Sequence, residues 1–167
     1  MGFLFRHQLP KKRILSLELN IYFREKFVFE IEKTDNILVL KIPSSMSEVG
    51  GAINTIESFF KQYDVSKNLA NQNCVVFREL VTNAIKHGHN HNSQLKVHVQ
   101  IEHLKDKQFK IMVKDEGNGF DHSRLDFSIP KNAREIRNRG FVLVHALIEH
   151  FQINEKGNCI TVFTLPF

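Results

Sequence analysis

Two short segments of the sequence hold carboxylate, carboxamide and glycine residues at spacings that suit ligand chemistry. Glu79 and Asn83 stand four residues apart, so they share one face of a predicted helix. Asp115 ends a predicted strand and is followed by Gly117 and Gly119. Together, and in this order, the two segments indicate a site for a nucleotide and a magnesium ion.

The helical segment suits a metal and a proton transfer. Magnesium prefers oxygen ligands and usually takes one or two from the protein, with the rest from water and phosphate. Asn83 can supply a neutral carbonyl oxygen, and Glu79 can orient or deprotonate a hydroxyl nucleophile near a γ-phosphate. Taken alone, this spacing is equally typical of the polar margin of a helix.

The glycine-rich segment suits a purine base. A buried carboxylate at Asp115 can accept a hydrogen bond from an exocyclic amine such as that of adenine. Gly117 and Gly119 can adopt a positive φ and let a ligand approach the backbone. Taken alone, the segment is an ordinary glycine-rich turn, and it lacks the further oxygen ligands of a calcium-binding EF-hand loop.

A third segment, residues 137–144, opens a predicted helix. Gly140 near its start exposes backbone N–H groups to an anion, and Arg137 and Arg139 can meet phosphates or remain solvated. The sequence contains no Gly-x-x-x-x-Gly-Lys-Ser/Thr motif, which excludes a P-loop.

Histidines and cysteines offer weaker signals. His87, His89 and His91 alternate in a way that can bind a transition metal, but no carboxylate or cysteine stands nearby in sequence, so a polar loop is favoured. Cys74 falls on a predicted helix and Cys159 on a predicted strand, and we expect both to be buried thiols.

Hydrophobic patterning predicts the elements that position these residues. Residues 26–33 and 37–42 form a hairpin, two strands cover 95–104 and 108–114, and a last strand covers 159–165. Helices are predicted for 47–62, for 67–87 with Ser66 as N-cap and Gly88 as the stop, and for 140–151. Strands grouped in pairs predict an α+β fold: a two-layer α/β sandwich whose mixed, mostly antiparallel sheet has helices on one face.

Composition narrows the class of protein. The chain of 167 residues suits one domain, predicted for 27–167, after a basic arm at 1–26. Most of the net charge of +5 lies in that arm, so the nearly neutral body argues against nucleic-acid binding. The arm can contact an acidic partner, although a solvated arm is favoured. Without a membrane span or signal-peptide core in the sequence, we expect a cytoplasmic protein.

At this point a family resemblance is clear. Glu79…Asn83, Asp115-x-Gly117-x-Gly119-Phe120 and Arg139-Gly140-Phe141 resemble the N, G1 and G2 boxes of the GHKL (Bergerat-fold) ATPases. The compact size and the short segment between the second and third boxes resemble the anti-sigma-factor serine kinases of the SpoIIAB and RsbW type. The resemblance covers about residues 37–167. It departs in two places: Asn138 replaces a glycine, and Asn158-Cys159 replaces Gly-Thr, with Thr161 two residues on.

The resemblance implies an ATP-dependent serine/threonine protein kinase that phosphorylates a serine of a STAS-type anti-sigma antagonist and sequesters a sigma factor as a homodimer. Its cofactors would be ATP and Mg²⁺. Asn83 would bind the metal, Glu79 would be the catalytic base and Asp115 would bind adenine. Residues 121–139 would form a lid. The other nucleotide-binding residues implied are His87, Gly117, Gly119, Phe120, Arg137, Arg139, Gly140, Phe141 and Thr161. The alternatives are a partner-switching module without kinase activity, with or without bound ATP, and a detached histidine-kinase catalytic domain.

Overall fold

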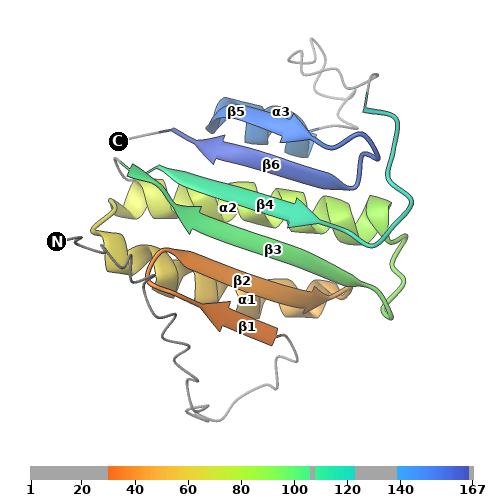
Figure 1. Ribbon diagram of the computed structural model, residues 1–167, viewed down its shortest axis with the longest axis horizontal. Helices are drawn as coiled ribbons and strands as arrows, with labels where there is room; N and C mark the ends of the chain where they lie inside the picture. Colours follow the sequence, from red (N-terminus) through yellow and green to blue (C-terminus); the bar gives the residue numbers. More distant parts are fainter. Residues whose placement is uncertain (1–29, 106–107, 123–138, 166–167) are drawn as a thin grey trace, which may run out of the picture.

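The fold is a two-layer α+β sandwich, seen in a computed structural model that describes residues 30–105, 108–122 and 139–165 (Figure 1). The described strands are β1 (Glu30–Lys33), β2 (Ile37–Pro43), β3 (Lys96–His103), β4 (Phe109–Lys114), β5 (Ile148–Ile153) and β6 (Cys159–Thr164). The helices are α1 (Met46–Phe60), η1 (Lys61–Tyr63, 3₁₀), α2 (Lys67–Asn83), η2 (Ala84–Gly88, π) and α3 (Arg139–Ala146). The predicted fold class is confirmed.

The described strands form one six-stranded sheet in the order β1-β2-β3-β4-β6-β5, and every described pair is antiparallel. Helices cover one face of this sheet (Figure 1). Alternate strand residues point to that face, and they are the buried ones. In β2, β3 and β4 they are Leu38, Leu40, Ile42, Val97, Val99, Ile101, Phe109, Ile111 and Val113.

The two long helices bury the faces that the sequence predicts. In α1, Ile53, Ile56 and Phe60 pack into the core. In α2 the buried residues include Val76, Phe77, Leu80 and Val81. Ser66 is the N-cap of α2, as predicted, because its Oγ accepts a hydrogen bond of 3.2 Å from the Leu69 N–H.

The end of the second helix differs from the prediction. We expected regular helix to His87 with Gly88 as the stop, but the α-helix ends at Asn83 and continues as the π-helical turn η2 through Gly88. The His89 N–H donates to the Ala84 carbonyl oxygen, five residues back, at 2.8 Å. A π-turn cannot be read from hydrophobic spacing, because Ala84 and Ile85 are buried in either geometry.

A strand replaces part of the predicted third helix. We expected helix from residue 140 to 151, whereas α3 ends at Ala146 and β5 follows. The pairing of β5 with β6 is irregular between Ile148 and His150. This bulge inserts one residue, so Ile148 and Phe151, three apart, both pack against the core. A three-residue apolar spacing is also helical, which explains the wrong prediction.

The two cysteines differ in burial. Cys74 is buried, as predicted, and burial raises its pKa to about 11. Cys159 is only half-buried, contrary to the prediction.

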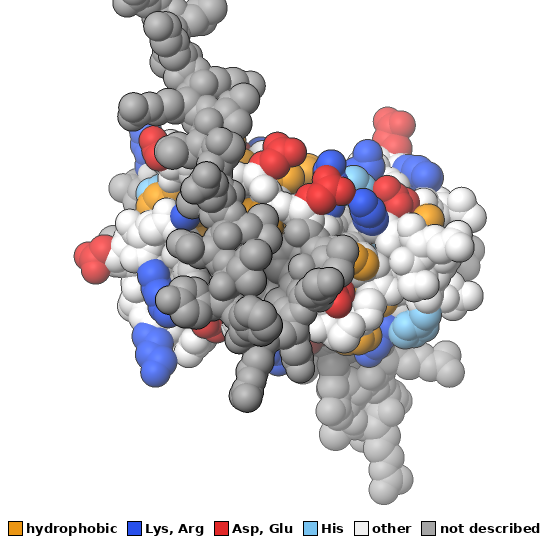
Figure 2. All heavy atoms as spheres, turned by 90° about the horizontal axis from the view of Figure 1, so that it is seen from below, with side chains coloured by type: hydrophobic (Ala, Val, Ile, Leu, Met, Phe, Trp, Pro, Cys, Tyr) orange, Lys and Arg blue, Asp and Glu red, His pale blue; other side chains and the backbone are white. Residues whose placement is uncertain are grey.

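The β1 edge of the sheet is charged. Figure 2 views the molecule from this side and shows acidic and basic side chains intermingled. There Glu30 pairs with Lys41 at 2.9 Å and Lys96 at 3.0 Å. The predicted basic arm, 1–26, lies outside the described residues. Among the described helices, none is long and apolar enough to cross a membrane.

Replacing Ser66 by Ala should lower the free energy of unfolding by about 1 kcal/mol, because the Leu69 N–H loses its acceptor. Replacement by Asp should restore it. The control is Ser58→Ala on the exposed side of α1, where the hydroxyl only bonds back to the Asn54 carbonyl. Urea unfolding would measure all three variants. An equal loss at both serines would contradict a specific capping role.

Candidate functional site

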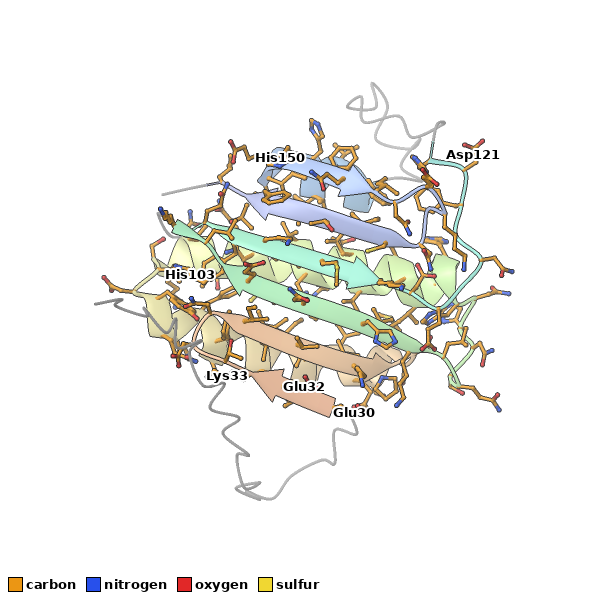
Figure 3. All side chains as sticks on the ribbon, viewed as in Figure 1. Glu30, Glu32, Lys33, His103, Asp121 and His150 are labelled. Atoms are coloured by element: carbon orange, nitrogen blue, oxygen red, sulfur yellow. The ribbon has the colours of Figure 1, made fainter. Side chains whose placement is uncertain are left out.

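The three predicted motifs meet at one end of the molecule. This is the right-hand end in Figure 1, where β4 and α2 finish and the chain after β4 rises toward α3. Figure 3 marks the two ends of the sheet, with Asp121 at this end and His103 at the other. The described residues here fall into two clusters, one around Glu79 and one around Asp115.

The first cluster joins Glu79 and Asn83 to the start of α3. Both side chains are half-buried and lie one turn apart on α2. Gly140 lies directly against them: a Cβ on this glycine would fall 2.4 Å from Glu79 Oε2 and 3.9 Å from Asn83 Nδ2. Any side chain at this position would push the Glu79 carboxylate aside, so a glycine suits this close approach of α3. A carboxylate, a carboxamide and the N-terminus of a helix therefore face one another.

The second cluster surrounds the Asp115 carboxylate. Asp115 is 8% exposed and extends the inward-facing row of Ile111 and Val113. Its Oδ1 accepts a hydrogen bond of 2.8 Å from the Gly117 N–H. A Cβ on Gly88 would lie 2.6 Å from Asp115 Cγ, and one on Gly117 would lie 2.0 Å from the Gly88 carbonyl oxygen. The end of η2 and the turn after β4 thus pack backbone to backbone around this carboxylate.

The π-turn aligns the two clusters. In a regular α-helix, Gly88 would lie on a different face from Glu79 and Asn83. It follows Asn83 by five residues, and one α-helical turn takes only about 3.6 residues. The wider turn of η2, closed by the bond from His89 N–H to the Ala84 carbonyl, brings the chain back toward the same side. One helical segment therefore supplies the Glu79 cluster and the glycine that touches Asp115.

The turn between β5 and β6 interlocks with the chain after Gly117. Gly119 has φ of +77° and Gly157 has φ of +74°. A Cβ on Gly119 would lie 1.8 Å from the Lys156 carbonyl oxygen, and one on Gly157 would lie 2.1 Å from the Phe120 carbonyl oxygen. Neither position accepts a side chain, so both glycines are required by conformation and by contact.

Asn158 extends this contact to Asp115. It is buried, and its Nδ2 donates to the Asp115 carbonyl oxygen at 2.9 Å, while the Asp115 N–H donates to the Asn158 carbonyl oxygen at 2.9 Å. Asn154 completes the network, because its Nδ2 donates to Asn158 Oδ1 and its Oδ1 accepts from the Asn158 N–H. The residue that departs from the family pattern therefore supports the backbone of Asp115.

A histidine and a glutamate hold the same turn from the other side. His89 is 3% exposed, and its Nε2 accepts a hydrogen bond of 2.9 Å from the Glu116 N–H. Burial lowers the pKa of His89. The hydrogen bond from His98 and then that from the Lys96 N–H lower the pKa of Glu116. His89 therefore has a structural partner, while His87 and His91 are exposed, and no cluster of three metal-binding side chains occurs among the described residues.

Not every predicted site residue joins the two clusters. Phe120 is 40% exposed beside the Gly157 turn. Phe141 lies with Leu80 and Val144 around a small apolar hollow under α3. Thr161 pairs with Met112, so it points to the sheet face opposite Asp115, which the described helices leave uncovered. Arg137 and the side chain of Arg139 lie outside the described residues.

Sequence reasoning missed three supporting residues. Gly88 was predicted only as a helix stop, His89 was considered only as a metal ligand, and Asn158 was taken only as a departure. For Asn158 the sequence does hold a signal, because Asn154-Glu-Lys-Gly157 is typical of a hairpin turn. The turn can be recognised only when a strand is placed before it, and β5 was predicted as helix. The contact of Gly88 with Asp115 has no local sequence signal.

The donor set fits a nucleotide with magnesium. One carboxamide oxygen suits a cation that takes most of its ligands from phosphate and water, and Gly140 leaves space beside Asn83 that a Cβ would fill. The start of α3 presents backbone N–H groups to an anion. The buried Asp115 carboxylate can accept a hydrogen bond from an amine.

Comparison with known proteins identifies the family of this chain. Residues 42–164 match the histidine kinase-like ATPase domain, which is most of the chain. The chain therefore belongs to the histidine kinase-like ATPase (GHKL) family, and this membership implies ATP binding.

Individual relatives are distant. The chain is 26% identical over 102 residues to an anti-sigma F factor of Shouchella clausii, covering 59% of this chain and 69% of that protein. It is 25% identical over 92 residues to the serine-protein kinase RsbW of Staphylococcus epidermidis, covering 55% of this chain and 58% of the kinase. Among solved structures, a histidine kinase domain from Erythrobacter litoralis is 16% identical, with a TM-score of 0.47, covering 74% of this chain and 61% of that one.

Replacing Gly157 by Ala should lower the free energy of unfolding by at least about 2 kcal/mol, because the left-handed φ and the contact with Phe120 both oppose a side chain. The matched control is Gly50→Ala in α1, where a Cβ meets nothing within 4 Å. That change should raise stability by up to about 1 kcal/mol. Thermal unfolding would compare them, and a neutral Gly157→Ala would refute the interlocking of the two turns.

Proposed function

We propose that this protein is an ATP-dependent serine/threonine protein kinase that acts as an anti-sigma factor. It phosphorylates a serine of a STAS-type anti-sigma antagonist and sequesters a sigma factor, as a homodimer. The observation that carries the kinase assignment is the contact of Gly140 with Glu79 and Asn83, because it unites a base, a metal ligand and a helix N-terminus. The similarity to an anti-sigma F factor and to RsbW supports the choice of partner and of serine.

Each described residue has a defined part in this proposal. Asp115 binds the adenine amine, and Gly88 and Gly117 let the end of η2 pack against the turn that carries this carboxylate. Asn83 holds magnesium through Oδ1, and the bound ion neutralises charge on the phosphates. Glu79 accepts the proton of the attacking serine hydroxyl. The backbone N–H groups at the start of α3 bind phosphate oxygens.

Purified protein should bind ATP in the presence of magnesium. Asn83→Ala should weaken binding or make it independent of magnesium, whereas Asp115→Asn should weaken binding with or without the metal, because it alters the proposed base contact and leaves the proposed metal ligand in place. Calorimetric titration with and without magnesium would measure both effects. Wild-type protein that binds no ATP would refute the proposed function.

Glu79→Gln should keep ATP affinity within a few-fold of wild type and reduce phosphoryl transfer by about 10²–10⁴-fold, because the general base is lost. The control is Glu57→Gln on α1, which removes one carboxylate away from the site. Transfer would be measured with labelled ATP and a STAS-type antagonist, followed by phosphoamino-acid analysis. Unchanged transfer would remove Glu79 from the base role.

The same assay separates the alternatives. ATP binding without transfer to any antagonist would support a partner-switching module that uses ATP as a conformational ligand. A phosphohistidine product would support a detached histidine-kinase catalytic domain.

A further inference from the structure

His89 is a buried histidine whose ring bonds to the backbone of the turn after β4. It follows η2, and its own N–H closes that π-turn on the Ala84 carbonyl. Its ring reaches across to the turn after β4, where Nε2 accepts the Glu116 N–H at 2.9 Å. Nδ1 has no hydrogen-bond partner among the described residues, so His89 acts on this turn through Nε2.

The Glu116 N–H lies in the middle of the Asp115–Gly117 turn. On one side of this turn, Asn158 Nδ2 holds the Asp115 carbonyl oxygen at 2.9 Å. On the other side, His89 holds the next N–H along the chain. The direction of the Asp115 carboxylate therefore depends on hydrogen bonds from outside the turn, these two among them, as well as on its own bond to the Gly117 N–H.

We propose that His89 is a positioning residue for Asp115 and performs this role only as a neutral imidazole, so that nucleotide affinity falls in acid. The inference rests on the proposed nucleotide site. The chemical reason is the direction of the hydrogen bond: an N–H donor needs a lone pair on Nε2, and a protonated imidazole has none. After protonation, the N–H on His89 Nε2 and the Glu116 N–H would face each other as two donors, so the hydrogen bond at this turn would be lost.

The charges around His89 act in opposite directions. Burial is the largest influence and lowers the pKa, and His98 on β3 also lowers it. The carboxylates of Asp115 and Glu116 raise it by a smaller amount. The net pKa lies below the ordinary value of 6.5, so the neutral form predominates in the folded protein above that pH. The bond is complete above pH 6.5 and is lost as the pH falls through the folded-state pKa.

His98 is the other buried or half-buried histidine that contacts Glu116. Its Nε2 lies 3.0 Å from Glu116 Oε1, and the side chain is 34% exposed. Protonation of His98 strengthens the attraction to the Glu116 carboxylate, so it opposes the loss caused by His89. The two histidines therefore predict opposite trends with pH and can be told apart by single substitutions.

The test is calorimetric titration with ADP and magnesium from pH 8 to pH 5.5. His89→Gln keeps an acceptor close to the position of Nε2 but does not titrate, so its pH dependence reports the protonation of ADP and of every other group except His89. Relative to that variant, wild type should lose more affinity between the two pH limits, but less than about tenfold, because the pKa of His89 lies below 6.5. His98→Gln should follow wild type or fall more steeply, and His89→Phe should bind weakly at every pH.

A second measurement needs no nucleotide. Hydrogen exchange of the Glu116 amide, followed by NMR, should show protection at pH 8 that is lost in acid in wild type but retained in His89→Gln. Identical pH profiles for wild type and His89→Gln in both measurements would overturn the inference while leaving the nucleotide site intact. Absence of ADP binding to wild type at pH 8, with normal Glu116 protection, would instead overturn the proposed function and the role of His89 in it.

Discussion

The organisation of this protein depends on one close approach, between the end of the second helix and the carboxylate that follows β4. Gly88 and Gly117 lie so near the Asp115 side chain and each other that neither can carry a Cβ. This contact fixes where α2 ends relative to the sheet. Because Glu79 and Asn83 lie on the same helix, it also fixes the distance between Asp115, which we propose to bind the base, and the two residues that we propose to face the phosphates. The sheet and core serve to hold this spacing.

Several unusual local features follow from that constraint. The π-turn η2 returns the chain toward the row of Glu79 and Asn83. The hairpin between β5 and β6 supplies Asn158 and Gly157, which hold Asp115 and the chain after it. His89 ties the π-turn to the same loop. Each feature departs from what a regular helix or strand would favour, and each is explained by a contact around Asp115.

Local patterns in the sequence predict most of the frame, and non-local contacts decide the remainder. The first hairpin, the N-cap at Ser66, the buried rows of α1 and α2, and strands β3, β4 and β6 follow from periodicity and capping chemistry. The bulge in β5 imitates helical spacing, so that strand was missed. The roles of Gly88, His89 and Asn158 depend on partners between 27 and 43 residues away in the chain, and no single sequence displays such a contact. Thr161 was assigned from the family resemblance, as a substitute for the Thr of the Gly-Thr pair, and strand register places it on the face opposite Asp115.

The most direct test is an NMR titration of amide chemical shifts, first with AMP and then with ADP and magnesium. The account predicts that AMP shifts the amides of Gly88, Asp115 and Gly117, and that ADP with magnesium adds those of Asn83 and Gly140. Met112 and Thr161, on the opposite face of the sheet, should stay unchanged. Shifts concentrated at Met112 and Thr161, or an AMP response that already includes Gly140, would contradict a site divided between a base cluster and a phosphate cluster.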